Sequence, residues 1–227
     1  MPRIRILLLL LLLPVSKAEG AQDGDPKLIT AAKRGDAARV KTLIQQGADV
    51  NEKDRNGKTA LIHAAMDNHF EVVRALVEAE ADANIVDSKG MTALMYSVAI
   101  ASPPLLSLTQ VARAHSATVE ALLEGGANLN IQTHHGWDAL MHTAWAGDTV
   151  ALKLLLDHDA EVNVRDREDR TPLMWAAFRG HRDVMEILMA RGADLTAKDR
   201  YGKTAWLIAR ERGHIRIVEM LDKASAR

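Results

Sequence analysis

Three histidines and a carboxylate lie close together in the middle of this sequence. His134 and His135 are adjacent, Asp138 follows three residues later, and His142 comes four residues after that. Imidazole and carboxylate groups can bind a transition metal or exchange protons with a substrate. However, adjacent histidines on a turn point in different directions, and their spacing matches no zinc motif such as H-E-x-x-H. We predict no metal here, and a metal-binding or enzymatic role centred on His134, His135 and His142 remains the alternative function.

No other pattern in the chain favours catalysis. Asp166, Glu168 and Asp169 are crowded on one predicted turn, but arginines on both sides balance their charge. A Ca²⁺ loop needs a glycine at its bend and a trailing glutamate, and neither is correctly placed. The sequence has no G-x-S-x-G motif, no phosphate-binding loop and no cysteine. We therefore predict that the chain is not an enzyme and binds no cofactor.

Internal repetition is the strongest pattern in the sequence. The segment Gly57-Lys58-Thr59-Ala60-Leu61 recurs, with changes, four more times, and a G-A-D-x-N block follows the second apolar stretch of most units. Self-similarity at a fixed period of this length predicts a repeat architecture in which neighbouring units stack. The period is constant except in one interval, which is longer and indicates an insertion. The repeats begin at Asp54, Asp87, Thr133, Asp166 and Asp199, and these positions differ in turn by 33, 46, 33 and 33.

Each repeat has the signals of two short helices. Thr171 stands where an N-cap hydroxyl belongs, and Pro172 follows at the first helical position. Gly180 then turns the chain, and apolar residues at helical spacing predict a second helix. Gly192 ends that helix, because glycine readily adopts the left-handed conformation. A pair of helices this short must bury its apolar faces against neighbouring units.

These residues resemble the ankyrin repeat family. The resemblance covers residues 25–223 and implies an all-α solenoid of about six stacked helix-turn-helix units, with β-turn fingers projecting from one edge. The expected units are 25–53, 54–86, 87–132, 133–165, 166–198 and 199–223.

The chain departs from the family pattern in two ways. The T-P-L-H motif is mostly T-A-L followed by Met or Ile, so the histidine that usually contacts the next unit is missing. Asn68, Glu80 and Asp159 occupy positions where the family usually has glycine. We expect left-handed backbone there, at a cost of roughly 1 kcal/mol for a residue other than glycine.

Unit three contains thirteen extra residues, within 100–113. Pro103-Pro104 is expected to end the preceding helix, and Leu105 to Ala114 can form an additional one. The stretch is apolar and nearly uncharged, which is unusual for an exposed loop. Two interpretations stay open: an added helix packed on the scaffold, or an element that contacts a partner.

The family resemblance also implies where a partner binds, namely on the concave surface made by the finger tips and the ends of the first helices. Trp145 and Phe178 occupy equivalent places in adjacent units, so we expect them to form one apolar patch, although both can instead pack on neighbouring helices. Trp175 and Trp206 are expected to be packing residues. The candidate partner-binding positions are Arg55, Asn56, Lys58, Met66, Asp67, Ser88, Lys89, Met91, His134, His135, Trp137, Trp145, Arg167, Arg170, Phe178, Arg179, Arg200, Tyr201 and Lys203.

Residues 1–18 have the layout of a secretory signal peptide. Arg3 and Arg5 precede an unbroken apolar run from Ile6 to Leu13, and Ser16-Lys17-Ala18 supplies small residues where a signal peptidase cleaves. The alternative is a membrane anchor, but the apolar run is far shorter than the roughly 20 residues needed to span a bilayer. We expect cleavage after Ala18, no membrane span in the mature chain, and export to the periplasm or secretion.

Composition argues against nucleic acid as the partner and leaves another protein as the expected one. The net charge is −1 and no run of Lys or Arg is present, so nucleic acid is not an expected ligand. An exported chain without cysteine must be stable through packing alone, which favours a bacterial source. We expect a monomer that binds one protein partner.

Overall fold

The computed structural model describes residues 25–99 and 108–225, and these residues form twelve helices and no strand. The predicted signal peptide lies outside the described residues. The helices are α1 (Lys27–Lys33), α2 (Ala37–Gln45), α3 (Ala60–Met66), α4 (Phe70–Glu78), α5 (Ala93–Ala99), α6 (Leu108–Glu124), α7 (Ala139–Ala146), α8 (Thr149–Asp157), α9 (Pro172–Arg179), α10 (Arg182–Ala190), α11 (Ala205–Glu211) and α12 (Ile215–Ser225). None of them has the length and apolar character that a bilayer-spanning helix requires.

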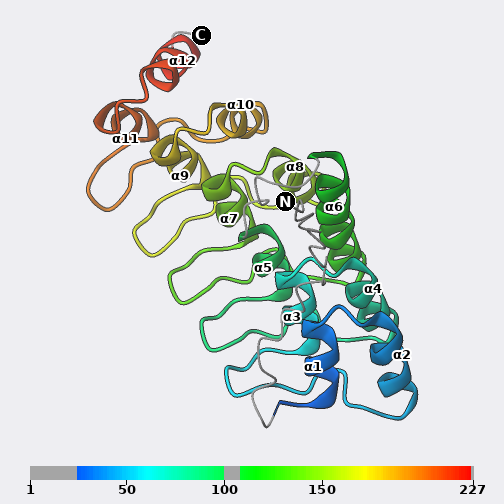
Figure 1. The fold of residues 1–227 in the computed structure, drawn as a ribbon. Coiled ribbons are helices and arrows are strands. Elements are labelled where there is room, and N and C mark those ends of the chain that lie inside the picture. The colour runs from blue at the N-terminus through cyan, green and yellow to red at the C-terminus, as the bar shows by residue number, and fades with distance from the viewer. Residues whose placement is uncertain (1–24, 100–107, 226–227) are drawn as a thin grey trace, which may run out of the picture.

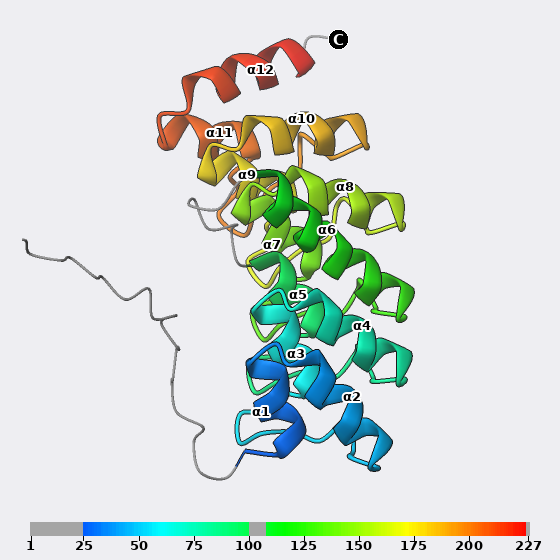
Figure 2. The same ribbon diagram turned by 45° about the vertical axis from the view of Figure 1, so that its right-hand side comes forward.

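The helices form a two-layered stack (Figure 1). The odd-numbered helices pack against one another in sequence, and each even-numbered helix packs on its predecessor in the chain. Successive pairs, from α1–α2 to α11–α12, are called unit one to unit six below. Figure 2 shows the same succession of pairs from a second direction. The predicted all-α ankyrin-type solenoid is confirmed.

Threonine side chains cap the N-terminal ends of most of the first helices. The Oγ1 atoms of Thr59, Thr171 and Thr204 accept hydrogen bonds from the backbone N–H three residues later, at 3.3–3.4 Å. Each bond satisfies one of the N–H groups that a helix start leaves unpaired. In unit four the cap is instead Asp138, which accepts from Met141 N–H at 2.8 Å.

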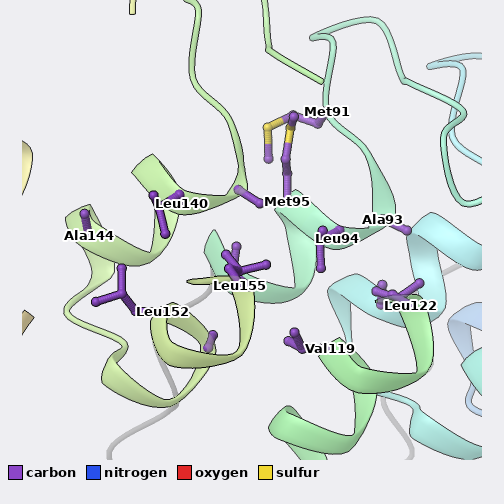
Figure 3. Close-up of a cluster of buried hydrophobic side chains, with 14 of the residues drawn as sticks. Met91, Ala93, Leu94, Met95, Val119, Leu122, Leu140, Ala144, Leu152 and Leu155 are labelled. Carbon is purple, nitrogen blue, oxygen red and sulfur yellow. The ribbon is translucent and has the colours of Figure 1, made fainter. Parts of the chain in front are cut away.

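The core lies between the two layers and consists mainly of small and aliphatic side chains. In Figure 3, Leu94, Leu122, Leu140, Leu152 and Leu155 from units three and four lie in one buried cluster. The alanines of the first helices are equally buried and allow neighbouring helices to approach closely. Burial of this aliphatic surface is what holds the units together.

Neighbouring fingers are linked through their backbones. Ser88 N–H donates to Asn56 O at 2.9 Å, and Arg167 N–H donates to His135 O at 3.2 Å. At Gly136 the backbone has φ +80°, and a Cβ atom there would lie 2.8 Å from the backbone nitrogen of Arg167. Any residue other than glycine would therefore push the fingers of units four and five apart.

The expected left-handed positions are present. Asn68, Glu80 and Asp159 have φ values of 54°, 57° and 63°. Asp169 is a fourth such position, with φ 59°, and it stands where the other fingers have Gly57, Gly90, Gly136 and Gly202, although it was not among the predicted positions.

The extra residues of unit three lengthen its second helix. α6 has 17 residues, whereas α4 and α8 have nine each. Residues 108–114 are therefore the first turns of α6, and the expectation of a separate helix over Leu105 to Ala114 is wrong for this part. The reason is that Ala114 stands where other units have a glycine or Asn68 in the left-handed conformation, so the chain continues as a helix. The remainder of the insertion, residues 100–107, lies outside the described residues.

Candidate protein-binding surface

Five aromatic rings from units four and five form one continuous cluster. Trp137, His142 and Trp145 come from the finger end and first helix of unit four, and Trp175 and Phe178 come from α9. The ring centroids of Trp137 and Trp175 are 4.6 Å apart. Those of Trp145 and Phe178 are 5.7 Å apart, and the two planes differ by 23°. We call these five residues the aromatic cluster.

The repeat period brings these rings together. Trp145 and Phe178 are separated by one repeat period, as are His142 and Trp175, so each pair occupies equivalent positions on α7 and α9. Because α7 packs directly on α9, equivalent side chains meet. The predicted contact between Trp145 and Phe178 is therefore confirmed, and Phe178 also packs against the core, as the alternative had it. Such ring pairs contribute about 0.5–1.5 kcal/mol beyond their buried area.

Trp175 anchors the cluster to the scaffold. Its side chain is 7% exposed, and its indole Nε1–H donates to Asp166 Oδ2 at 3.0 Å. Trp206 also packs against the core, and its Nε1–H donates to Asp222 Oδ1 at 2.8 Å. Both were expected to be packing residues, and the structure confirms this. Trp137, Trp145 and Phe178 are only partly buried, so part of each side chain reaches the surface.

Three arginines lie over the rings of this cluster. The Cζ atoms of Arg170, Arg179 and Arg212 are 4.7, 4.7 and 3.6 Å from the ring centroids of Trp175, Trp145 and Phe178, respectively. A guanidinium over an aromatic face is attracted by the ring quadrupole. The surface therefore combines apolar rings with positive charge.

A groove of about 370 Å³ adjoins the cluster between α9 and α11. Its walls include Trp175, Phe178, Tyr201 and Arg212. A second groove, of about 460 Å³, lies between α10 and α12, but long flexible side chains such as Arg182, Met189 and Lys223 line it and it contains no aromatic ring. Flexible side chains such as Met174 and Lys203 line the first groove as well, but it differs from the second in its three aromatic rings, the kind of residue that dominates protein interfaces.

Two titratable groups of unit four are strongly affected by burial. Burial raises the pKa of the Asp138 carboxyl to about 7, although the hydrogen bond from Met141 N–H acts in the opposite direction. Burial also lowers the pKa of His142 to about 4. The Nε2 atom of His142 is buried and has no hydrogen-bond partner among the described residues. His142 is therefore neutral at pH 7 and serves as a ring in the cluster.

The structure places the sequence-predicted residues in two groups along the stack. Trp137, Trp145, Arg170, Phe178 and Arg179 belong to the aromatic cluster and its arginines. Tyr201, which is 65% exposed, and Lys203 line the groove, and Arg167 and Arg200 are exposed on the neighbouring fingers. The exposed finger residues His134 and His135 lie beside them, and His134 Nε2 is 3.2 Å from Ser88 O.

The remaining predicted residues lie towards the N-terminal end. Lys58 Nζ is 3.3 Å from Met66 Sδ and 4.5 Å from the centroid of the Tyr96 ring, and Arg55 is exposed on its finger. Asn56, Asp67, Ser88 and Lys89 are exposed as well. Met91 is a correction. Its side chain is 9% exposed and lies beside Met95 in the buried cluster of Figure 3, because the finger folds it back onto its own helix.

Sequence reasoning missed one residue of this surface. Arg212 lies over Phe178 and lines the groove. It follows Arg179 by one repeat period, so carrying the position of Arg179 into the next unit identifies it.

The three histidines of the alternative function do not assemble into a metal site. Among the described residues, no three His, Cys, Asp or Glu side chains are placed to hold a metal ion. The His142 ring packs edge-on against Trp137, with centroids 5.2 Å apart, while His134 contacts the finger of unit three.

Comparison with known proteins agrees with this architecture. A sequence model described as ankyrin repeats (3 copies) matches residues 28–102 and 108–199. The crystal structure of the ankyrin repeat protein EF0377 shares 28% identity and a TM-score of 0.75, with 86% of this chain and 96% of that chain covered. One chain of the solved complex between the predatory endopeptidase Bd0816 of Bdellovibrio bacteriovorus and the immunity protein Bd3460 shares 27% identity and a TM-score of 0.73. That match covers 88% of this chain and 98% of the other. A search of curated proteins gives no match. Since the family model matches well over half of the residues, this chain belongs to the ankyrin repeat family.

Proposed function

We propose that this protein is an exported, monomeric binding protein that holds one protein partner against the aromatic cluster and the adjacent fingers. The observation that carries the proposal is the partly exposed group of rings, Trp137, Trp145 and Phe178, with Arg179 and Arg212 stacked on it. Ankyrin repeats are scaffolds for protein–protein interaction. The proposal assigns that role to one surface of this chain.

The chemistry of this surface fits a protein interface. Trp, Tyr and Arg dominate the binding energy of protein interfaces, and such a residue often contributes about 2 kcal/mol or more. Trp175 is fixed by its bond to Asp166, so the rings that pack on it are held rigidly before binding. Pre-organised anchors of this kind lose little conformational entropy on association.

A more specific version is that the partner is an enzyme that the protein masks. The basic and apolar start of the sequence supports export, and one of the similar solved structures is a complex of an immunity protein with an endopeptidase. A stack that covers an exported enzyme would protect the producing cell. The alternative role is a scaffold that stabilises such an enzyme through the same surface. The two roles are distinguished by whether the protein inhibits or preserves the activity of its partner.

The test is affinity capture from envelope extracts of the source organism, with the protein expressed from its full-length sequence. The wild type is compared with Trp145→Ala/Phe178→Ala and with the matched control Val150→Ala/Ile215→Ala. Val150 and Ile215 are 45% and 69% exposed, lie on second helices and are not members of the aromatic cluster. We expect one stoichiometric protein with the wild type and the control, and its loss with the cluster variant. Equal recovery by all three proteins, or no specific protein at all, would contradict the proposal.

A further inference from the structure

We propose that the surface recognised by this protein is acidic: an extended segment whose carboxylates bind Arg179 and Arg212 while an apolar side chain enters the groove beside Phe178. This inference rests on the proposed function and specifies the chemistry of the partner.

The stacking geometry of the two arginines prepares them for carboxylates. Arg212 lies 3.6 Å from the centroid of Phe178, and Arg179 lies 4.7 Å from that of Trp145. A guanidinium that lies flat over a ring leaves the N–H donors at its edge free to bind another group. Those donors match the two oxygens of a carboxylate, which bind in a bidentate manner. Because the rings already orient the arginines, less side-chain entropy is lost when a carboxylate binds.

Neither arginine has an acidic partner among the residues that the structure describes. Arg182 in α10 and Arg191, which directly follows this helix, differ in this respect. Arg182 Nη2 lies 2.8 Å from Glu186 Oε1, and Arg191 Nη2 lies 2.5 Å from Asp157 Oδ1. These arginines are thus balanced within the fold, while Arg179 and Arg212 remain unbalanced beside the groove.

The fingers extend this positive surface. The repeated carboxylates of Asp87, Asp166 and Asp199 are buried and accept hydrogen bonds from their own finger backbones, so they are not on the surface that a partner contacts. Near the cluster, the acidic finger residues that reach the surface are Glu168, which is partly exposed, and Asp169. The basic finger residues near the cluster are Arg167, Arg170, Arg200 and Lys203, which outnumber these two acids. Of these four, Arg170 lies 3.8 Å from Asp199 and Lys203 lies 2.6 Å from Glu211, so Arg167 and Arg200 add to the positive charge of Arg179 and Arg212.

The spacing of the two arginines favours an extended segment. They occupy equivalent positions at the ends of the first helices of adjacent units, α9 and α11, which pack together. Packed helices lie about 8–10 Å apart. On an extended chain, side chains two residues apart point to the same side, and residues four apart are separated by about 13 Å. Glutamates at these outer positions can reach both arginines through their long side chains, and an apolar residue midway between them faces the groove of Phe178, Tyr201 and Arg212.

The experiment measures the binding of model peptides to the purified protein through its tryptophan fluorescence, at low and high salt. One short peptide has a central phenylalanine with one glutamate two residues before it and another two residues after it. Two others carry glutamine or lysine in place of every glutamate, and a single-stranded oligonucleotide serves as a polyanion without carboxylates. We expect the glutamate peptide to bind at least about tenfold more tightly than the glutamine peptide, and salt to reduce this preference.

Matched variants assign the preference to the two arginines. Arg179→Ala/Arg212→Ala is expected to abolish it, and Arg179→Lys/Arg212→Lys to retain only part of it, because lysine keeps the charge but not the planar donor edge. Arg39→Ala/Arg216→Ala removes the same charge from exposed positions on second helices. This control is expected to retain the preference for the glutamate peptide. Thermal unfolding of each variant shows whether the loss of a basic residue at a helix end has destabilised the fold.

Three results would overturn the proposal: equal binding of the glutamate and glutamine peptides, equal binding of the oligonucleotide, or a preference that survives Arg179→Ala/Arg212→Ala in a folded protein. Capture of a partner that is lost in Trp145→Ala/Phe178→Ala would then still support the protein-binding function. The failure of the acidic partner and the failure of the function are therefore distinguishable.

Discussion

Asp166 accepts a hydrogen bond from the indole of Trp175, nine residues later in the same unit, at 3.0 Å. The same register recurs in units two and three, where Asp54 Oδ2 lies 2.8 Å from His63 Nε2 and the Tyr96 hydroxyl donates to Asp87 at 2.7 Å. Each of these three units thus ties its finger to its first helix through a carboxylate and a ring.

Unit four breaks this register. Its ring is His142, but the residue nine positions earlier is Thr133, which has no carboxylate. The Thr133 hydroxyl accepts from the backbone N–H groups of His135 and Trp137. This substitution explains why His142 Nε2 is buried without a hydrogen-bond partner among the described residues.

Thr133→Asp is therefore expected to stabilise the fold. A carboxylate at this position would accept from His142 Nε2, and satisfying a buried donor contributes roughly 1–2 kcal/mol. Burial now lowers the pKa of His142 to about 4, so the wild type loses stability as the pH falls from about 6.5 towards 4. The new carboxylate raises that pKa, so the advantage of the variant increases as the pH falls. Urea unfolding at several pH values measures both effects.

The control for this prediction is the same substitution in a His142→Ala background. In that background the new carboxylate can still accept hydrogen bonds from the finger backbone, but the histidine ring that would donate to it is absent. We therefore expect no gain in the free energy of unfolding. A gain of equal size in both backgrounds would show that the finger, and not His142, is responsible.

Asp138→Thr is expected to stabilise the protein above neutral pH. The Asp138 side chain is 2% exposed, and burial raises its pKa to about 7. A carboxyl whose pKa is raised by folding gives full stability below its unfolded pKa of 3.8, and this stability is lost as the pH rises through 7. Threonine caps the first helix of units two, five and six without this loss. The variant should match the wild type near pH 4 and exceed it by roughly 2–4 kcal/mol at pH 8.

The reverse change provides the matched test. Thr171→Asp places a carboxyl at the equivalent buried cap of α9 and should make the free energy of unfolding fall over the same pH range. If the free energies of unfolding of the wild type and Asp138→Thr change with pH in parallel, the burial of Asp138 does not control stability in this range.

Much of the fold follows from the spacing of the repeats alone. The constant period identifies equivalent residues, and stacking makes equivalent residues neighbours, which is why the contact between Trp145 and Phe178 was predictable. The left-handed backbone at Asn68, Glu80 and Asp159 was predictable for the same reason, since the turn geometry is set by the repeat and not by the single residue.

The features that escaped prediction depend on side-chain direction or on the broken period. Met91 occupies a finger position that we expected to be exposed, but its long side chain turns back to the core. In unit three, the longer interval showed that residues were inserted but not where the second helix began. That start depends on the absence of a turn-forming residue at position 114, so α6 runs through the usual turn, and His115 within it pairs with Asp148 of the next unit at 2.5 Å.

Glu80→Gly is expected to stabilise the protein by roughly 0.5–1 kcal/mol, because glycine relieves the steric strain of a left-handed backbone while its freedom in the unfolded chain offsets part of the gain. Glu80 has φ 57°, whereas units one, three and five have Gly47, Gly126 and Gly192 at this position. Glu78→Gly, two residues earlier in α4, is the control and should cost about 1 kcal/mol, because that position is helical. Thermal unfolding compares the two, and a loss of stability in both would show that the backbone at residue 80 is not strained.

The aromatic cluster as a partner-binding surface is tested most directly by the dissociation constant of the purified partner, measured calorimetrically, for three proteins. They are the wild type, Trp145→Ala/Phe178→Ala, and Val150→Ala/Ile215→Ala, and circular dichroism confirms that each is folded at the temperature of the measurement. We predict that the cluster variant binds roughly 100-fold or more weakly, as expected for the loss of two central anchors, and that the control binds like the wild type. Unchanged affinity in a folded cluster variant, or equal weakening in the control, would contradict the assignment of this surface.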